Sequence, residues 1–319
     1  MNFRPAVKLL TLPLIFLLFL PLAGTAWIGV LSRSLPDVGF LADPHATFSI
    51  TVLDWDGNRK TFSVGPGNPS WTPFDATPAH LRNAVLAGED FSFYSHNGVD
   101  WFEVRESFRK NLRLRKFARG ASTITQQLAK NLFLSRDKTV TRKIRELILA
   151  RRLEKTLTKD RILELYLNVV ELGEMIYGIG QGSLFHFGKN PTQISLREST
   201  FLAAMLPGPK VFTPEHHMDR VMNRSDHILS VMLKGRMISE NEYLEALAEV
   251  PMSAEPLSGG DPRLQLPRGE DDESPVQSPG EDPLPPYHQL EPEPQPMPIP
   301  ENGSQPPGGL PFVSDPSGS

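Results

Sequence analysis

The chain opens on a long apolar segment. Leu9 to Leu31 includes no charged residue, and a helix of this length could cross a hydrocarbon core of about 30 Å. Arg4 and Lys8 precede it, which predicts that residues 1–8 stay in the cytoplasm, that residues 9–31 form a transmembrane anchor, and that the rest lies outside. A cleaved signal peptide is the alternative, because Gly24-Thr25-Ala26 supplies small residues after an apolar core. Both interpretations export the rest of the chain.

A different pattern follows this segment. Apolar and polar residues alternate from Thr47 to Val64 around Asp56-Gly57-Asn58. Alternation on both sides of such a turn sequence predicts a β-hairpin. We place it in a juxtamembrane segment, residues 32–66, and expect its role to be structural.

The pattern becomes helical farther along the chain. From Pro78 to about Leu247 the apolar positions follow the helical period. Two capping boxes, Ser195 with Glu198 and Ser239 with Glu242, predict helix starts within this region. The fold class is therefore mainly α, with a single domain over residues 67–250.

The composition changes after Val250. Of the 31 prolines, 18 lie from Pro251 onward, mixed with Gly, Ser, Glu and Asp. Such a segment has too few apolar residues to bury a core, so residues 251–319 are predicted to be a disordered Pro-rich tail. An alternative role for part of this tail is that the segment around Pro292 to Pro300 forms a polyproline II helix that binds a partner protein.

Charge and cysteine content narrow the classes of function. The chain has no cysteine, which excludes disulfides, cysteine catalysis and a lipoprotein anchor. The net charge is only −4, but Arg105 to Lys159 contains 17 Lys or Arg against four acids. Part of this charge belongs to solvated helix faces, and the remainder should attract anions.

Two polar segments stand out as candidate sites. The first runs from Glu89 to Asp100, where acids, a histidine and aromatic residues follow the apolar helix Leu81–Ala87. Taken alone, it could be a capped helix end with core phenylalanines. The second runs from Gly120 to Asn131, where Gln126 and Gln127 follow three hydroxyl residues. A helix start with Ser122 as N-cap would explain the hydroxyl residues but not both glutamines.

Two further segments read as helix faces. Arg142 and Glu146 stand at positions i and i+4, and taken alone they favour an ordinary surface ion pair. Arg161 to Asn168 is an amphipathic helix, in which we interpret Glu164 and Asn168 as structural or as supporting the residues that contact substrate.

In this order, the four segments resemble the glycosyltransferase domain of the penicillin-binding proteins and their monofunctional relatives, glycosyltransferase family 51. The resemblance covers about Trp71 to Tyr243. It rests on four motifs: ED-x-x-F-x-x-H-x-G-x-D, G-x-S-T-I-T-Q-Q-L-x-K-N, R-K-x-x-E and I-L-E-x-Y-L-N. Gln181 to Lys189 departs from the Ala-rich helix usual before Phe-Gly-Lys in that family.

The resemblance implies a lysozyme-like helical fold with a large lobe, a smaller lobe near the membrane and a cleft between them. It implies that lipid II is polymerised with inversion and release of undecaprenyl pyrophosphate, with Glu89 as general base. Asp90 could raise the pKa of Glu89 through its like charge. Glu146 matches the second important carboxylate, which positions substrate or a cation. The other residues implied in substrate binding are Asp90, Phe93, His96, Gly98, Ser122, Thr123, Gln127, Lys130, Asn131, Lys138, Arg142 and Lys143.

The expected partners and location follow from this resemblance. The partners would be lipid II, the growing lipid-linked strand, the membrane, transpeptidases and other cell-wall synthesis proteins, without nucleic acid. No cofactor is expected to be required, although a Mg²⁺ or Mn²⁺ ion could sit at the pyrophosphate. Because only the tail follows the domain, we expect a single-pass enzyme on the outer face of the cytoplasmic membrane that polymerises glycan without cross-linking it.

Three other classes are weighed against this one. A lytic enzyme would share the helical cleft and the lone Glu but does not account for the cations from Lys130 to Lys143. A membrane-tethered interaction protein would not need Glu89, Gln127 and Glu146 intact. A nucleic-acid binder explains only the basic stretch.

Overall fold

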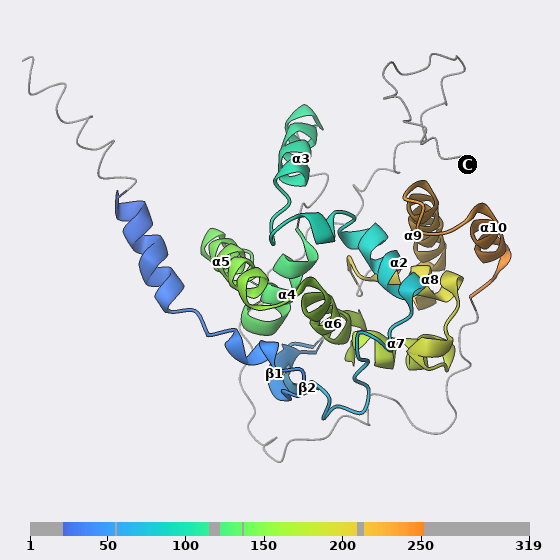
Figure 1. Cartoon of the computed structure of the whole chain (residues 1–319), viewed down its shortest axis with the longest axis horizontal. Helices are drawn as coiled ribbons and strands as arrows, with labels where there is room; N and C mark the ends of the chain where they lie inside the picture. The colour runs from blue at the N-terminus through green and yellow to red at the C-terminus, as the bar shows by residue number, and fades with distance from the viewer. Residues whose placement is uncertain (1–21, 55, 115–121, 136, 209–213, 252–319) are drawn as a thin grey trace, which may run out of the picture. The chain divides into compact units, whose positions relative to one another are not determined.

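The structure is a computed structural model that describes residues 22–251 apart from residues 55, 115–121, 136 and 209–213. Helices make up most of the described chain (Figure 1), so the predicted mainly α fold class is confirmed. The predicted tail lies outside the described residues except for Pro251. Residues 9–21 of the predicted membrane anchor also lie outside them.

The described chain begins with a helix over residues 22–33. None of the helices in the described ranges is both long and apolar enough to cross a membrane. The end of this first helix is fixed to the body by Arg152, whose guanidinium donates to the carbonyl oxygens of Leu35 at 3.3 Å and Pro36 at 3.0 Å.

The predicted β-hairpin is confirmed. Strands β1 (Phe48–Leu53) and β2 (Arg59–Val64) pair antiparallel, with Ile50 opposite Phe62. In the turn, the Asn58 amide donates to the Asp54 carboxylate at 2.7 Å, and Gly57 adopts φ +91°, which favours glycine. Phe62 and Ile50 are buried with the helices in one core, so the hairpin is part of the domain.

The helices follow one another with short connections. In chain order they are α2 (Ala79–Glu89), α3 (Trp101–Leu114), α4 (Ile124–Phe133), α5 (Val140–Thr156), α6 (Lys159–Val169), α7 (Gly178–Phe187), α8 (Leu196–Met205), α9 (Pro214–Lys234) and α10 (Glu240–Ala248). Short 3₁₀ turns cover Gly39–Ala42, Phe93–Ser95 and Pro191–Gln193. A small ladder of β3 (Glu171–Gly173) and β4 (Ile176–Tyr177) interrupts the helical region, and the hydrophobic period did not predict it.

The helices pack in two groups. Helix α4 lies against α5 and α6, while α2 lies against α8 and α9, and α10 covers α9 and α8 (Figure 1). Residues of α2, α4 and α9 meet at the C-terminal end of α2. The candidate site lies at this junction.

Helix starts follow the local capping rules. Ser195 with Glu198 and Ser239 with Glu242 form the predicted capping boxes. The N-cap of α4 is Thr123, whose side chain accepts from the Gln126 amide, and not Ser122, which is exposed. The threonine fits because its extended backbone lets the hydroxyl oxygen reach an unpaired amide of the first turn.

A buried polar joint fixes α9 against α8. Arg197 is 2% exposed, donates to the Ser225 hydroxyl at 3.1 Å and pairs with the Asp226 carboxylate at 2.6 Å. A buried guanidinium needs such partners. Ser225 and Asp226 directly follow Arg224, so these contacts fix the orientation of α9 about its own axis at Arg224.

The two residues interpreted as structural have that role. The Asn168 side chain accepts from the Thr72 amide and donates to the Thr72 carbonyl, both at 2.8 Å. Glu164 accepts from the Phe74 amide at 3.0 Å and pairs with Arg161 at 2.6 Å. Both side chains tie the chain before α2 to α6.

Candidate active site

Glu89 is the last residue of α2, and its side chain is 8% exposed. One carboxylate oxygen accepts from the Gln127 side-chain amide at 2.7 Å, and the other accepts from the Arg224 guanidinium at 3.3 Å. Burial raises the pKa of Glu89, and the hydrogen bond from Gln127 and the charges of Arg224 and Lys130 offset that effect only in part. A raised pKa suits a carboxylate that must take up a proton near neutral pH.

Asp90 is not what raises that pKa. Burial is the cause, because the Asp90 carboxylate points away to other partners: the Ile124 amide at 2.9 Å and the His96 ring at 2.9 Å. Asp90 is buried, so its part in the site is to hold the loop after α2 against the start of α4. The helix N-terminus favours its negative charge there.

His96 completes this loop. Its Nδ1 accepts from the Gly98 amide at 3.2 Å, which leaves Nε2 to donate to Asp90. Gly98 has φ +82°, and a Cβ there would lie 3.2 Å from the Ala150 carbonyl oxygen. Glycine is therefore required by both the backbone and the space. The Gly98 carbonyl accepts from the Thr123 hydroxyl at 2.8 Å.

The two adjacent glutamines have different partners. Gln127 donates to Glu89, and its own carbonyl accepts from the Tyr166 hydroxyl at 3.2 Å. Gln126 donates to Gly98 at 3.3 Å and accepts from Lys143 at 3.0 Å. Lys143 in turn pairs with Glu146. Helix α4 thus stands between Glu89 and Glu146, which explains why both positions carry an amide.

The pair of Arg142 and Glu146 is not an ordinary surface ion pair. Glu146 is 3% exposed, and its two oxygens accept separately from Arg142, at 2.6 Å, and from Lys143. Lys143 also donates to the Ser122 hydroxyl at 3.0 Å. Two cations share one buried carboxylate, so the start of α5 keeps a positive excess beside the exposed Ser122.

The remaining predicted residues differ in burial and in their contacts with the site. Lys130 is half-buried on α4 and close enough to Glu89 to lower its pKa. Phe93 is fully buried and Thr123 is 3% exposed, so neither can itself contact a substrate in this structure, and they act by packing and capping. Within the described ranges, no hydrogen bond joins Asn131 or the exposed Lys138 to the residues around Glu89 and Glu146.

Sequence reasoning missed two members of the site. Arg224 on α9 donates to Glu89 and to the Gly88 carbonyl at 3.1 Å. Tyr166 on α6 is fully buried, and burial raises its pKa well above the usual range, so its hydroxyl remains a donor to Gln127. A search for cations outside the basic stretch, on the polar side of the predicted α9, would have suggested Arg224.

The described residues do not offer a set of metal ligands. No group of three or more His, Asp or Glu side chains in the described ranges could hold an ion. The oxygens of Glu89 and Glu146 already accept from Gln127, Arg224, Arg142 and Lys143. The side chains therefore do not fit a protein-held Mg²⁺ or Mn²⁺, and no step is assigned to one.

The site thus has a buried carboxylate of raised pKa at a helix end, hydrogen-bonded to the Gln127 amide and the Arg224 guanidinium. A carboxylate of this kind can accept a proton from a hydroxyl group. Comparison with known proteins gives the family: residues 58–233 match the Transglycosylase family. The chain belongs to that family, as the motifs predicted.

Two sequence relatives agree with this assignment. A Cupriavidus necator protein assigned as a transglycosylase is 42% identical over 57% of this chain and 78% of its own length. Penicillin-binding protein 1A of Aquifex aeolicus is 37% identical over 69% of this chain. A crystal structure of penicillin-binding protein 1A from Haemophilus influenzae covers 65% of this chain at 22% identity and a TM-score of 0.36. The chain spans about a third of the length of the Aquifex relative.

Proposed function

We propose that this chain is a peptidoglycan glycosyltransferase that polymerises lipid II outside the cytoplasmic membrane. Glu89 removes the proton from the acceptor sugar 4-hydroxyl, whose oxygen attacks the anomeric carbon of the growing strand. The bond from that carbon to the pyrophosphate oxygen breaks, with inversion, and undecaprenyl pyrophosphate leaves. The supporting observation is the buried Glu89, whose raised pKa and two hydrogen bonds suit a general base.

The cations have a separate role in this proposal. The leaving pyrophosphate is anionic, and positive charge placed where that anion forms lowers the barrier. Lys130 is close enough to Glu89 to lower its pKa, and Arg142 and Lys143 stand at the start of α5. Because Glu146 occupies Arg142 and Lys143, its task is to fix their positions. The direct assay is polymerisation of labelled lipid II by the full chain, and an absence of glycan product under membrane-like conditions would overturn the proposal.

The two-lobed, lysozyme-like arrangement belongs to the same proposal. So does the membrane location. Helix α3 supports it, since its exposed side chains combine large apolar residues with cations, the composition of a helix that lies at a membrane surface. The apolar ones are Trp101, Phe102, Phe108 and Leu112, and the cations are Arg105, Arg109, Lys110 and Arg113.

The N-terminal segment provides the first prediction. Full-length protein should fractionate with membranes and keep its N-terminal residues, because the uncharged run from Leu9 to Leu31 can span the bilayer. N-terminal sequencing of the mature protein checks this. A mature N-terminus at Trp27, with polymerase activity in the soluble fraction, would support the cleaved signal peptide instead.

The second prediction concerns the pH dependence. Glu89 acts as a base only when ionised, so kcat/KM should rise with pH through its raised pKa. Arg224→Gln removes a charge that lowers this pKa, and the acid limb of the profile should therefore move to higher pH. Arg220→Gln, on the exposed side of α9, is the control and should leave the limb in place. If the acid limb of the pH profile were unchanged in Arg224→Gln, the charge of Arg224 would not set the pKa of Glu89.

The third prediction concerns Lys130. Lys130→Ala should lower kcat/KM on the order of 100-fold, because a cation near the pyrophosphate acts on both substrate capture and departure of the leaving group. Lys130→Arg should recover part of the activity. Steady-state kinetics with labelled lipid II measures the effect, and Lys155→Ala, exposed on α5, is the matched control. Equal rates for the two alanine variants would remove Lys130 from the site.

A further inference from the structure

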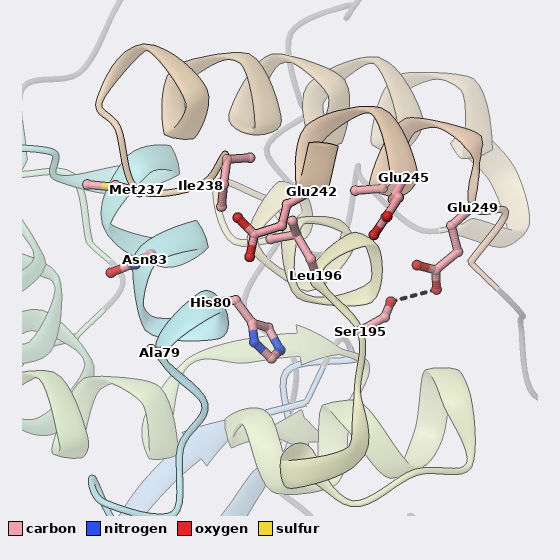
Figure 2. A pocket seen from close by; sticks show the side chains of 11 residues that line it. Ala79, His80, Asn83, Ser195, Leu196, Met237, Ile238, Glu242, Glu245 and Glu249 are labelled. Carbon is pink, nitrogen blue, oxygen red and sulfur yellow. Dashed lines mark hydrogen bonds between the residues drawn. The ribbon is translucent and has the colours of Figure 1, made fainter. Parts of the chain in front are cut away.

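A cavity lies away from Glu89, at the other end of α2. It has a volume of about 420 Å³ and opens between the first turn of α8 and helices α2 and α10 (Figure 2). Its apolar wall includes Leu196, Met237 and Ile238. The residues from α2 are Ala79, His80 and Asn83, at the end of α2 opposite Glu89. At a rise of 1.5 Å per residue, His80 and Glu89 are about 13 Å apart along the helix.

The other wall of this cavity is acidic. Figure 2 shows Glu242, Glu245 and Glu249 on the α10 side, opposite His80. The Ser195 hydroxyl bonds to Glu249 at 2.6 Å, and the His80 ring contacts the Ile194 carbonyl at 3.0 Å. Among the described residues, no Lys or Arg lines the cavity. Three carboxylates and apolar side chains together suit a ligand that carries both cations and aliphatic groups.

The described chain ends at this cavity. Glu249 lines it, and the last described residue, Pro251, lies two positions farther on and is buried. Among residues 252–319 there are only two Lys or Arg, Arg263 and Arg268. They bracket Leu264 and Leu266 in the sequence Pro-Arg-Leu-Gln-Leu-Pro-Arg. This segment has the cations and aliphatic groups that the cavity walls complement.

The connection is long enough for the segment to return. Arg263 lies twelve positions after Pro251, and an extended chain of that length reaches about 40 Å. Closing a loop of this size costs little more than closing a shorter one. Because both partners belong to one chain, their effective concentration is of the order of millimolar, and a weak site is sufficient.

We propose that residues 262–268 dock into this cavity, with the arginines facing Glu242, Glu245 and Glu249 and the leucines on the apolar wall. Docking fixes the start of the Pro-rich tail beside α10. It leaves Glu89 uncovered, because the cavity lies at the other end of α2. The site is therefore an intramolecular peptide site and not part of the glycosyltransferase site.

Disulfide trapping in the full chain tests this docking. The chain has no cysteine, so Asn83→Cys with Gln265→Cys creates a single thiol pair, and a disulfide forms only when the two Cα atoms come within about 7 Å. Asn83→Cys with Gln277→Cys is the matched control, with the second thiol outside the docking segment. At low micromolar protein and low salt, we expect the first pair to oxidise about tenfold faster than the control. Met237→Cys, which also lines the cavity, can replace Asn83→Cys if that variant does not fold.

Charge reversal identifies the cause. Adding Glu245→Lys should remove the rate advantage, whereas Glu240→Lys, on the same helix outside the cavity, should preserve it. Equal oxidation rates for Gln265→Cys and Gln277→Cys would overturn the proposal. Disulfide-linked dimers whose yield rises with protein concentration would also overturn it, since they would assign the cavity to the segment of a second copy.

Discussion

Glu89→Gln should lower lipid II turnover by a factor on the order of 100 or more. Glutamine keeps the size of the side chain and an acceptor for Gln127, but it cannot take the proton from the sugar hydroxyl, and general-base help contributes about 100-fold to 10,000-fold. Binding of lipid II should persist, because the cations at Lys130 and Lys143 are unchanged. Single-turnover kinetics and a separate binding titration measure the two effects.

The same variant should not lose stability at neutral pH. Burial raises the pKa of Glu89 above its unfolded value, so the ionised carboxylate is a cost to the folded state that grows as the pH rises from about 4.5 through the folded pKa. Removing the charge removes that cost. Thermal unfolding at several pH values measures whether Glu89→Gln is at least as stable as the wild type. In the activity assay, a folded Glu89→Gln enzyme with near wild-type turnover would make Glu146 the next candidate base.

Asp90→Ala should destabilise the protein by about 3 kcal/mol and abolish most activity. The variant loses the acceptor for the Ile124 amide at the start of α4 and the partner of His96. Losing a hydrogen bond to a charged group costs about 1.5–3 kcal/mol, and here a buried backbone donor is left unpaired as well. Urea unfolding gives the stability, and activity should fall because the loop that holds Glu89 loosens.

Two controls separate position from charge at this residue. Asp219→Ala, exposed on α9, removes a carboxylate without a buried partner and should change stability by less than about 0.5 kcal/mol. Asp90→Asn keeps an acceptor for the Ile124 amide and should lie between the two. If Asp90→Ala were as stable as Asp219→Ala, the hydrogen bonds that join the loop after α2 to α4 would not contribute to the free energy of unfolding.

Local features of the fold could be predicted from the sequence. The turn at Asp56-Gly57-Asn58 and the capping boxes at Ser195 and Ser239 depend on residues within three or four positions of one another, so their signals are complete in the sequence. The sequence did not distinguish Ser122 from Thr123 as the N-cap of α4. Thr123 stands one position later with the same chemistry, and only the backbone path into α4 decides between neighbouring hydroxyl residues.

The candidate site could be predicted only in part. The motifs around Glu89, Gln127 and Glu146 identified the family, and both carboxylates are buried in the structure. The sequence suggested that Asp90, the next residue, could raise the pKa of Glu89. Burial raises it instead, because adjacent residues at a helix end can point to different partners, and Asp90 faces Ile124 and His96.

The sequence alone determined the family, the mainly helical fold class and most of the residues gathered near Glu89. The tertiary structure alone decided which of them are buried, that Arg224 from a helix 135 positions away reaches Glu89, and that Arg142 and Lys143 share Glu146. The physical reason is range. Helix period, caps and turns arise from interactions between near neighbours, whereas burial, and with it the pKa of a carboxylate, is set by packing between elements that the sequence does not place side by side.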